Sequence, residues 1–176
     1  MADNLVSLGV GGAVTAPPSG GTVVLCIGNV LLSDEGVGVH AAGMLFEQGL
    51  PADVTLVEGG TDGFKLLNVI VEAGRIIVVD CIKGGAEPGS LYRFDIEDAP
   101  TSFAGVKTSV HQIGILEVIH MSELISGRTP RTTFLGCEPA SLAMSMELSP
   151  TVAAKLPRLV ELVFEELAKD AALAGA

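Results

Sequence analysis

The sequence of 176 residues predicts a doubly wound α/β fold built on a mostly parallel sheet. Short apolar runs recur along the chain, for example at residues 23–27 and 76–79, and uninterrupted runs of this kind are typical of strands buried on both faces. Segments with helical periodicity separate these runs, as expected of alternating strands and helices. The length suits one domain with a single hydrophobic core.

The first half of the chain supplies three strands and two helices. A strand is predicted over residues 22–28, followed by a helix over about 35–48 that Ser33 or Asp34 caps. A second strand, about 54–58, leads into a turn at Gly59, Gly60 and Thr61. Asp62 is predicted to cap a helix that extends to residue 73, and the third strand follows over residues 75–82.

The second half begins with a turn over residues 83–89 and a short strand, 90–95, predicted to lie antiparallel at the edge of the sheet. Ser109 begins a helix that runs to about residue 124, and residues 131–136 form the last strand before Glu138 and Pro139 break the pattern. Ser149 and Pro150 mark the start of a final helix over about 151–169, because a cap residue followed by proline favours a helix start.

The ends of the chain lack a core-forming pattern. Residues 1–21 are small, Gly-rich and Pro-containing, so we expect a flexible leader without a packed element. Residues 22–170 are predicted to form the single α/β domain, and residues 171–176 a short tail.

Composition restricts the class of protein. A net charge of −11 disfavours a nucleic-acid partner. Mean hydropathy is +0.53, yet no apolar run approaches the ~18 residues that a spanning helix requires, so no membrane segment is expected. Cys26, Cys81 and Cys137 are too few for a disulfide framework and are interpreted as small core residues. With no signal peptide at the start, we expect a cytoplasmic protein, and a monomer.

Three polar residues are predicted to follow strands at the edge of the sheet where ligands bind in doubly wound folds. Glu35 follows the first strand, Asp80 ends the third, and His111 begins the helix after the fourth. Two carboxylates and an imidazole form a ligand set suited to nickel, zinc or iron, with coordination positions left for a substrate.

Each of these residues also has an ordinary explanation. Asp80 could be a capping or hydrogen-bonded carboxylate, and His111 a surface or core histidine, as we expect of the other two histidines. Carboxylates at a helix start are favoured by the helix dipole, which suffices for Asp34 and could account for Glu35. On that basis Asp34→Asn is expected to be mild. No GxGxxG, GxxxxGK[ST] or GxSxG motif is present.

Four segments in this order resemble the hydrogenase maturation endopeptidases, which trim the large-subunit precursor of nickel–iron hydrogenases. The segments are residues 28–38 (Gly-Asn-Val-Leu-Leu-Ser-Asp-Glu-Gly-Val-Gly), Gly59-Gly60-Thr61, Asp80 at the end of an apolar strand, and residues 109–114 (Ser-Val-His-Gln-Ile-Gly). The resemblance covers almost all of residues 22–167 and implies a five-stranded sheet between helices. Where the family usually has Asp before the Gly-Gly-Thr turn, this chain has Glu58, to which we assign no role.

The resemblance implies a hydrolase, a protease of aspartic or metal-dependent type, that removes the C-terminal extension of the precursor after nickel insertion. It implies that Glu35, Asp80 and His111 bind nickel supplied by the precursor, a site that other divalent metals could also occupy. Gly59, Gly60 and Thr61 are similar to a loop that helps recognise the precursor. Whether Asp80 also serves as a base is left open by the sequence.

Two other functions use the same features. A nickel or zinc carrier could hold its metal with the same three residues and deliver it without cutting a chain, but it would bind free metal tightly. A flavodoxin-like module that binds a small molecule is disfavoured by the missing phosphate loop.

Overall fold

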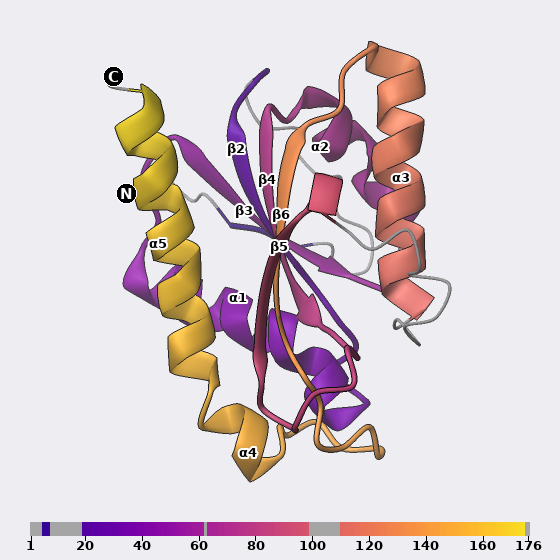
Figure 1. The fold of residues 1–176 in the computed structure, drawn as a ribbon, viewed down its shortest axis with the longest axis vertical. Helices are drawn as coiled ribbons and strands as arrows, with labels where there is room; N and C mark the ends of the chain where they lie inside the picture. The colour runs from indigo at the N-terminus through magenta and orange to yellow at the C-terminus, as the bar shows by residue number, and fades with distance from the viewer. Residues whose placement is uncertain (1–4, 8–18, 62, 99–109, 175–176) are drawn as a thin grey trace.

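The computed structural model describes residues 5–7, 19–61, 63–98 and 110–174; the side chains of residues 5–7, 98, 110–113 and 174 are outside this description. In these ranges the chain forms one six-stranded sheet with helices on both faces (Figure 1). The predicted doubly wound, mostly parallel α/β fold is therefore confirmed. Among the described helices, none is both long and apolar enough to cross a membrane.

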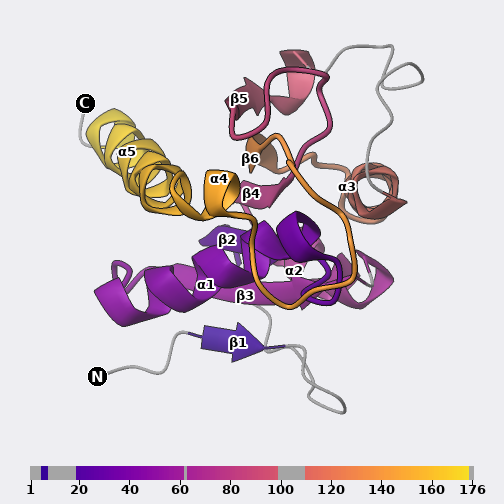
Figure 2. The same ribbon diagram turned by 90° about the horizontal axis from the view of Figure 1, so that it is seen from below.

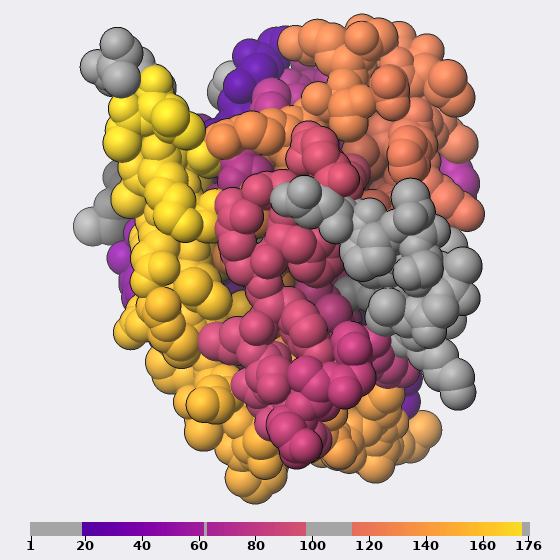
Figure 3. All heavy atoms as spheres, viewed as in Figure 1, coloured from indigo at the N-terminus to yellow at the C-terminus, as the bar shows by residue number. Residues whose placement is uncertain are grey.

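The strand order is β1-β3-β2-β4-β6-β5, and all neighbours are parallel except β5, which pairs antiparallel with β6 at the edge. In the space-filling view, β5 and the loop before it cover this edge between α5 and α3 (Figure 3). Five of the strands match the predicted ones to within about two residues. The bounds are β1 (Leu5–Ser7), β2 (Thr22–Ile27), β3 (Val54–Gly60), β4 (Arg75–Cys81), β5 (Leu91–Asp95) and β6 (Arg131–Cys137).

Strand β1 lies within the segment for which we expected no packed element. Leu5 pairs with Leu56 and Ser7 with Glu58, so β1 extends the sheet beyond β3 and brings the number of strands to six rather than five. A three-residue edge strand is held by main-chain pairing and needs no long apolar pattern. The expectation of an unstructured leader is therefore wrong for these three residues.

The helices divide between the two faces of the sheet (Figure 2). One face packs against α1 (Val37–Gln48), the short α4 (Pro150–Ala153) and α5 (Leu156–Ala174), and the other against α2 (Leu67–Glu72) and α3 (Val110–Ser126). Alternate residues of β4 enter the two cores, for example Ile77 and Val79 on the α1 side and Ile76 and Val78 on the α2 side. This arrangement explains why residues 76–79 of β4 are apolar on both faces of the sheet.

The helix boundaries differ from the predicted ones at the starts of α1 and α2 and in the final helix, which continues to Ala174 into the predicted tail instead of ending at about residue 169. The 3₁₀ turns η1 (Ser33–Gly36) and η2 (Gly63–Leu66) precede α1 and α2, and η3 (Ile96–Asp98) follows β5. The predicted final helix is divided into α4 and α5, because Pro157 has no N–H to continue the ladder and can only occupy a first turn. The predicted caps Asp62 and Ser109 lie outside the described residues.

Candidate functional site

The carboxyl ends of β2 and β4 define the switch point of the sheet. From β2 the chain moves to β3 on one side, and then returns to β4 on the other side of β2. Connections leave in opposite directions here, which opens the crevice that doubly wound folds use for their sites. The loop after β2 carries Glu35 in η1, and Asp80 is the next-to-last residue of β4. The two predicted carboxylates therefore flank the switch point.

Hydrogen bonds within the loop that carries Glu35 hold it in a closed conformation. The N–H of Asn29 donates to the Glu35 carbonyl oxygen at 3.1 Å, and the side-chain oxygen of Asn29 accepts from the N–H of Leu31 at 3.0 Å. A Cβ at Gly28 would lie 2.3 Å from the same Glu35 carbonyl oxygen, so only glycine fits. The Gly-Asn pair of the sequence motif thus fixes the backbone position of Glu35.

Gly38 brings this loop against β4. A Cβ at this position would lie 2.1 Å from the carbonyl oxygen of Ile27 and 2.5 Å from that of Val79. Because glycine removes that obstacle, the start of α1 rests directly on the ends of β2 and β4, and η1 packs against β4. A glycine three residues after Glu35 is therefore needed so that the start of α1 can pack against β2 and β4.

Both carboxylates are buried at this position. Asp80 has 0% and Glu35 7% of its surface exposed, and Oδ1 of Asp80 accepts the N–H of Cys81 at 2.7 Å. Burial raises the pKa of the Cys81 thiol, and the negative charges of Asp80 and then Glu35 raise it further. Both negative charges thus act on the Cys81 thiol, because the fold brings the two carboxylates to the same region. All three cysteines are free and buried, as predicted.

His111 lies in the first turn of α3, and its side chain is outside the described residues. The last turn of α3 leads through residues 127–130 to the start of β6, so the first turn lies toward the carboxyl edge of the sheet. Gly63, just beyond β3, is close enough that its Cβ would contact Gly114 at 3.4 Å. Among the described residues, no three His, Cys, Asp or Glu side chains form a group able to hold a metal ion. The three-residue ligand set therefore stays a prediction.

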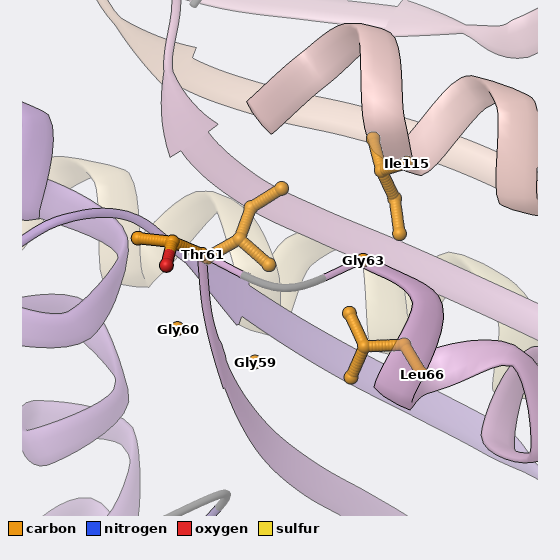
Figure 4. Close-up of a pocket in the computed structure, with 7 residues that line it drawn as sticks. Gly59, Gly60, Thr61, Gly63, Leu66 and Ile115 are labelled. Atoms are coloured by element: carbon orange, nitrogen blue, oxygen red, sulfur yellow. The ribbon is translucent and has the colours of Figure 1, made fainter. Parts of the chain in front are cut away.

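The Gly59-Gly60-Thr61 segment differs from the predicted turn. Strand β3 continues through Gly60, whose φ of 55° ends it, and the turn begins at the exposed Thr61. A Cβ on Gly59 would lie 2.8 Å from the side chain of Ile27, so glycine allows the strand to lie close to its neighbour. Figure 4 shows Leu66 and Ile115 facing this segment across a shallow hollow.

Asp34 has a role that the sequence did not reveal. We expected a helix cap, but neither η1 nor α1 has a side-chain cap. The buried carboxylate instead accepts three N–H groups of the loop after β6: Ala140 and Ser141 on Oδ2, both at 2.8 Å, and Ser149 on Oδ1 at 2.7 Å. Asp34 therefore ties the loop after β2 to the loop after β6.

Glu138 makes a similar connection on the other side. Its Oε2 accepts the N–H groups of Gly84 at 2.8 Å, Gly85 at 3.0 Å and Ala86 at 3.3 Å, together with the hydroxyl of Tyr92. Glu138 thus holds the loop that follows Asp80 and β4. The signal available in the sequence was its position, a carboxylate directly after a buried strand, as for Asp80.

Fold and site together define a doubly wound α/β protein with an acidic site at the switch point of its sheet. Residues 39–166 match the family described as hydrogenase maturation protease. The chain is 37% identical to the hydrogenase expression/formation protein HupD of Rhodobacter capsulatus over 82% of this chain and 70% of that protein. It is 32% identical to the hydrogenase 2 maturation protease of Escherichia coli, over 82% and 89% of the two chains.

The solved structure of the hydrogenase maturating endopeptidase HybD from E. coli has the same fold, with a TM-score of 0.77 and 33% identity over 85% of this chain and 93% of that one. The chain belongs to the hydrogenase maturation protease family. It is thus a hydrolase that cleaves a protein during hydrogenase maturation, which confirms the family and the class of activity expected from the sequence.

Proposed function

We propose that this protease is the endopeptidase that removes a C-terminal extension from the large-subunit precursor of a nickel–iron hydrogenase after nickel has been inserted. The observation that carries the proposal is the burial of Glu35 and Asp80 at the switch point, where the neighbouring parallel strands β2 and β4 end. Two carboxylates held together away from water favour a cation between them, because a cation offsets their mutual repulsion.

The cation in this proposal is nickel that the precursor carries. Glu35, Asp80 and His111 supply two carboxylates and an imidazole, a donor set that suits Ni²⁺. These groups would bind a nickel ion with open coordination positions in the loaded precursor. The empty precursor would offer them no metal ion to bind. The resulting difference in binding free energy selects the precursor that is ready for cleavage. When present, the metal can polarise a carbonyl group or activate water.

The remaining residues complete the proposed recognition. Gly59, Gly60 and Thr61 contact the precursor beside the metal-binding groups, and the exposed turn at Thr61 supports this role. Asp80, a buried carboxylate next to the end of β4, is a candidate general base as well as a ligand. The protein acts as a monomer in the cytoplasm, in keeping with its three free, buried thiols.

One experiment tests reaction, substrate and metal dependence together. The protein is incubated with nickel-loaded and with nickel-free large-subunit precursor, and the mass of the precursor is followed. The expected result is a loss of mass at the C-terminus of the loaded precursor only. Cleavage of both forms at equal rates would refute the role of nickel. Tight binding of free nickel without any cleavage would favour a carrier instead.

A further inference from the structure

The loop between β6 and α4, residues 138–149, is attached directly to the segment that precedes Glu35. The N–H of Ser145 donates to the carbonyl oxygen of Leu31 at 3.0 Å, and the N–H of Ser33 donates to the carbonyl oxygen of Ser145 at 2.8 Å. Leu32 and Ser145 thus form an isolated parallel bridge. Figure 2 shows the loop passing around the start of α1. The bridge makes residues 31–33 and 144–146 neighbours.

Further contacts fix the loop along its length. Asp34 accepts N–H groups near the start of the loop and at Ser149 near its end. The hydroxyl of Ser33 donates to the carbonyl oxygen of Glu147 at 3.0 Å, and Nε2 of His40 lies 3.3 Å from the carbonyl oxygen of Met146. Hydrogen bonds to a buried carboxylate are stronger than ordinary ones. The loop is therefore a fixed surface and not a loose connection.

This fixed loop presents apolar side chains to solvent. Met144 is 89% exposed and Met146 66%, and Leu31, across the bridge, is 56% exposed. Exposed apolar side chains that adjoin one another on a protein surface are a common mark of an interaction site. Methionine is suited to this purpose because its unbranched, polarizable side chain adapts to the partner's surface. We call these three residues the methionine patch.

We propose that the methionine patch is the surface on which the body of the client protein docks, and this inference rests on the function proposed above. The occupant follows from position: the patch begins four residues before Glu35, on the same closed loop. A folded protein that brings a segment of its chain to Glu35 and Asp80 must cover the neighbouring surface. Because the patch has no group able to bind metal or move a proton, it contributes affinity and not chemistry.

A pair of matched substitutions tests the proposal. Met144→Glu places a charge in the methionine patch. Leu124→Glu places the same charge at a residue that is 87% exposed, near the end of α3 and at the opposite edge of the sheet from the patch. With nickel-loaded precursor, Met144→Glu is expected to raise KM about tenfold or more and to leave kcat unchanged. Leu124→Glu should behave as the unaltered protein, and both variants should melt at its temperature.

A cross-linking experiment gives a readout that is independent of cleavage. Because the three native cysteines are buried, Met144→Cys and Leu124→Cys each introduce a single accessible thiol for a photoreactive maleimide. The Met144→Cys protein should cross-link to the precursor, whether or not nickel is loaded, and the Leu124→Cys protein should not. Equal cross-linking by the two, or an unchanged KM for Met144→Glu, would overturn the docking surface. Failure of the unaltered protein to cleave any precursor would instead refute the proposed function.

Discussion

At the scale of single residues, we expect that the proposed metal-binding groups can be removed without unfolding the protein. Asp80→Asn keeps the acceptor for the Cys81 N–H while it deletes the charge, and it relieves repulsion between Asp80 and the neighbouring Glu35. His111→Ala removes the imidazole. Both variants are expected to lose processing of nickel-loaded precursor by at least about a hundredfold, in the range seen when a group that orients or binds in the transition state is lost.

The measurement combines precursor cleavage, followed by mass, with thermal melting of each variant. Asp80→Asn should melt at or slightly above the temperature of the unaltered protein. If both variants are folded and still process precursor at the normal rate, nickel-guided recognition through these residues is wrong.

Asp34→Asn is now expected to be harmful, contrary to the mild effect that the sequence suggested. Both oxygens of the carboxylate accept main-chain N–H groups, and an amide must turn its NH₂ toward at least one of these donors. We expect a loss of about 2–4 kcal/mol in the free energy of unfolding, as for broken buried networks, measured by urea denaturation. Glu161→Gln, in an exposed ion pair with Arg158, is the control and should change stability by less than about 0.5 kcal/mol.

Residues of the site could be predicted where their position follows from the order of strands and helices, and not where they bind main-chain groups far away in the sequence. The location of Glu35 and Asp80 in one region could be predicted because their position after a strand of a doubly wound sheet follows from the order of elements. Asp34 and Glu138 hold loops that lie 52 to 115 positions away in the sequence, and their partners in those loops are main-chain N–H groups. Such donors exist at nearly every residue, so no pattern of residue types reveals the pairing.

At the scale of elements, a charged cluster attaches α5 to the sheet and makes stability depend on pH. Glu166 of α5 bonds to Arg93 of β5 through both carboxylate oxygens, at 3.2 Å each, and to Lys169 at 2.7 Å. Burial favours a higher pKa for Glu166, but these hydrogen bonds and charges outweigh it and hold the pKa below the ordinary value of 4.5. A depressed pKa in the folded state stabilises the protein at a pH above the unfolded-state value.

This stabilisation should disappear as the pH falls from about 4.5 through the lower, folded-state pKa of Glu166. Glu166→Gln removes the titrating group, so the difference in unfolding free energy between the unaltered protein and this variant should shrink over that interval. Chemical denaturation at pH 7, 5, 4 and 3 measures it. A difference that stays constant with pH would contradict the role of the Glu166 charge.

The elements themselves were predictable to the extent that they carry a periodic pattern. β2 and β4 are nearly continuous runs of buried apolar residues, β3 and β6 contain shorter ones, and the positions of all four strands were predicted closely. The division between α4 and α5 was missed because the apolar periodicity continues across the break, although Pro157 carried the signal.

At the scale of the whole molecule, β1 is the element that the sequence concealed, and it protects an edge of the sheet. Without it, the outer main-chain groups of β3 would be open to pairing with another chain. The site lies at the carboxyl ends of β2 and β4, where main-chain pairing with β1 plays no part. Loss of β1 should therefore affect stability and self-association but not catalysis.

Deletion of residues 1–18 tests this separation. In the described part of this segment, three residues pair with β3, so the melting temperature should fall by roughly 2–8 °C, which corresponds to about 1–2 kcal/mol for a domain of this size. Cleavage of nickel-loaded precursor should continue at the normal rate, while size-exclusion chromatography shows dimers or larger species that grow with concentration. The full-length protein with the substitution Val6→Pro gives a matched control. Proline cannot donate a main-chain hydrogen bond to the sheet, so this variant should show part of the fall in melting temperature. A truncated protein that is folded and monomeric but inactive would mean that the N-terminal segment contacts the client, so that β1 serves recognition as well as the edge of the sheet.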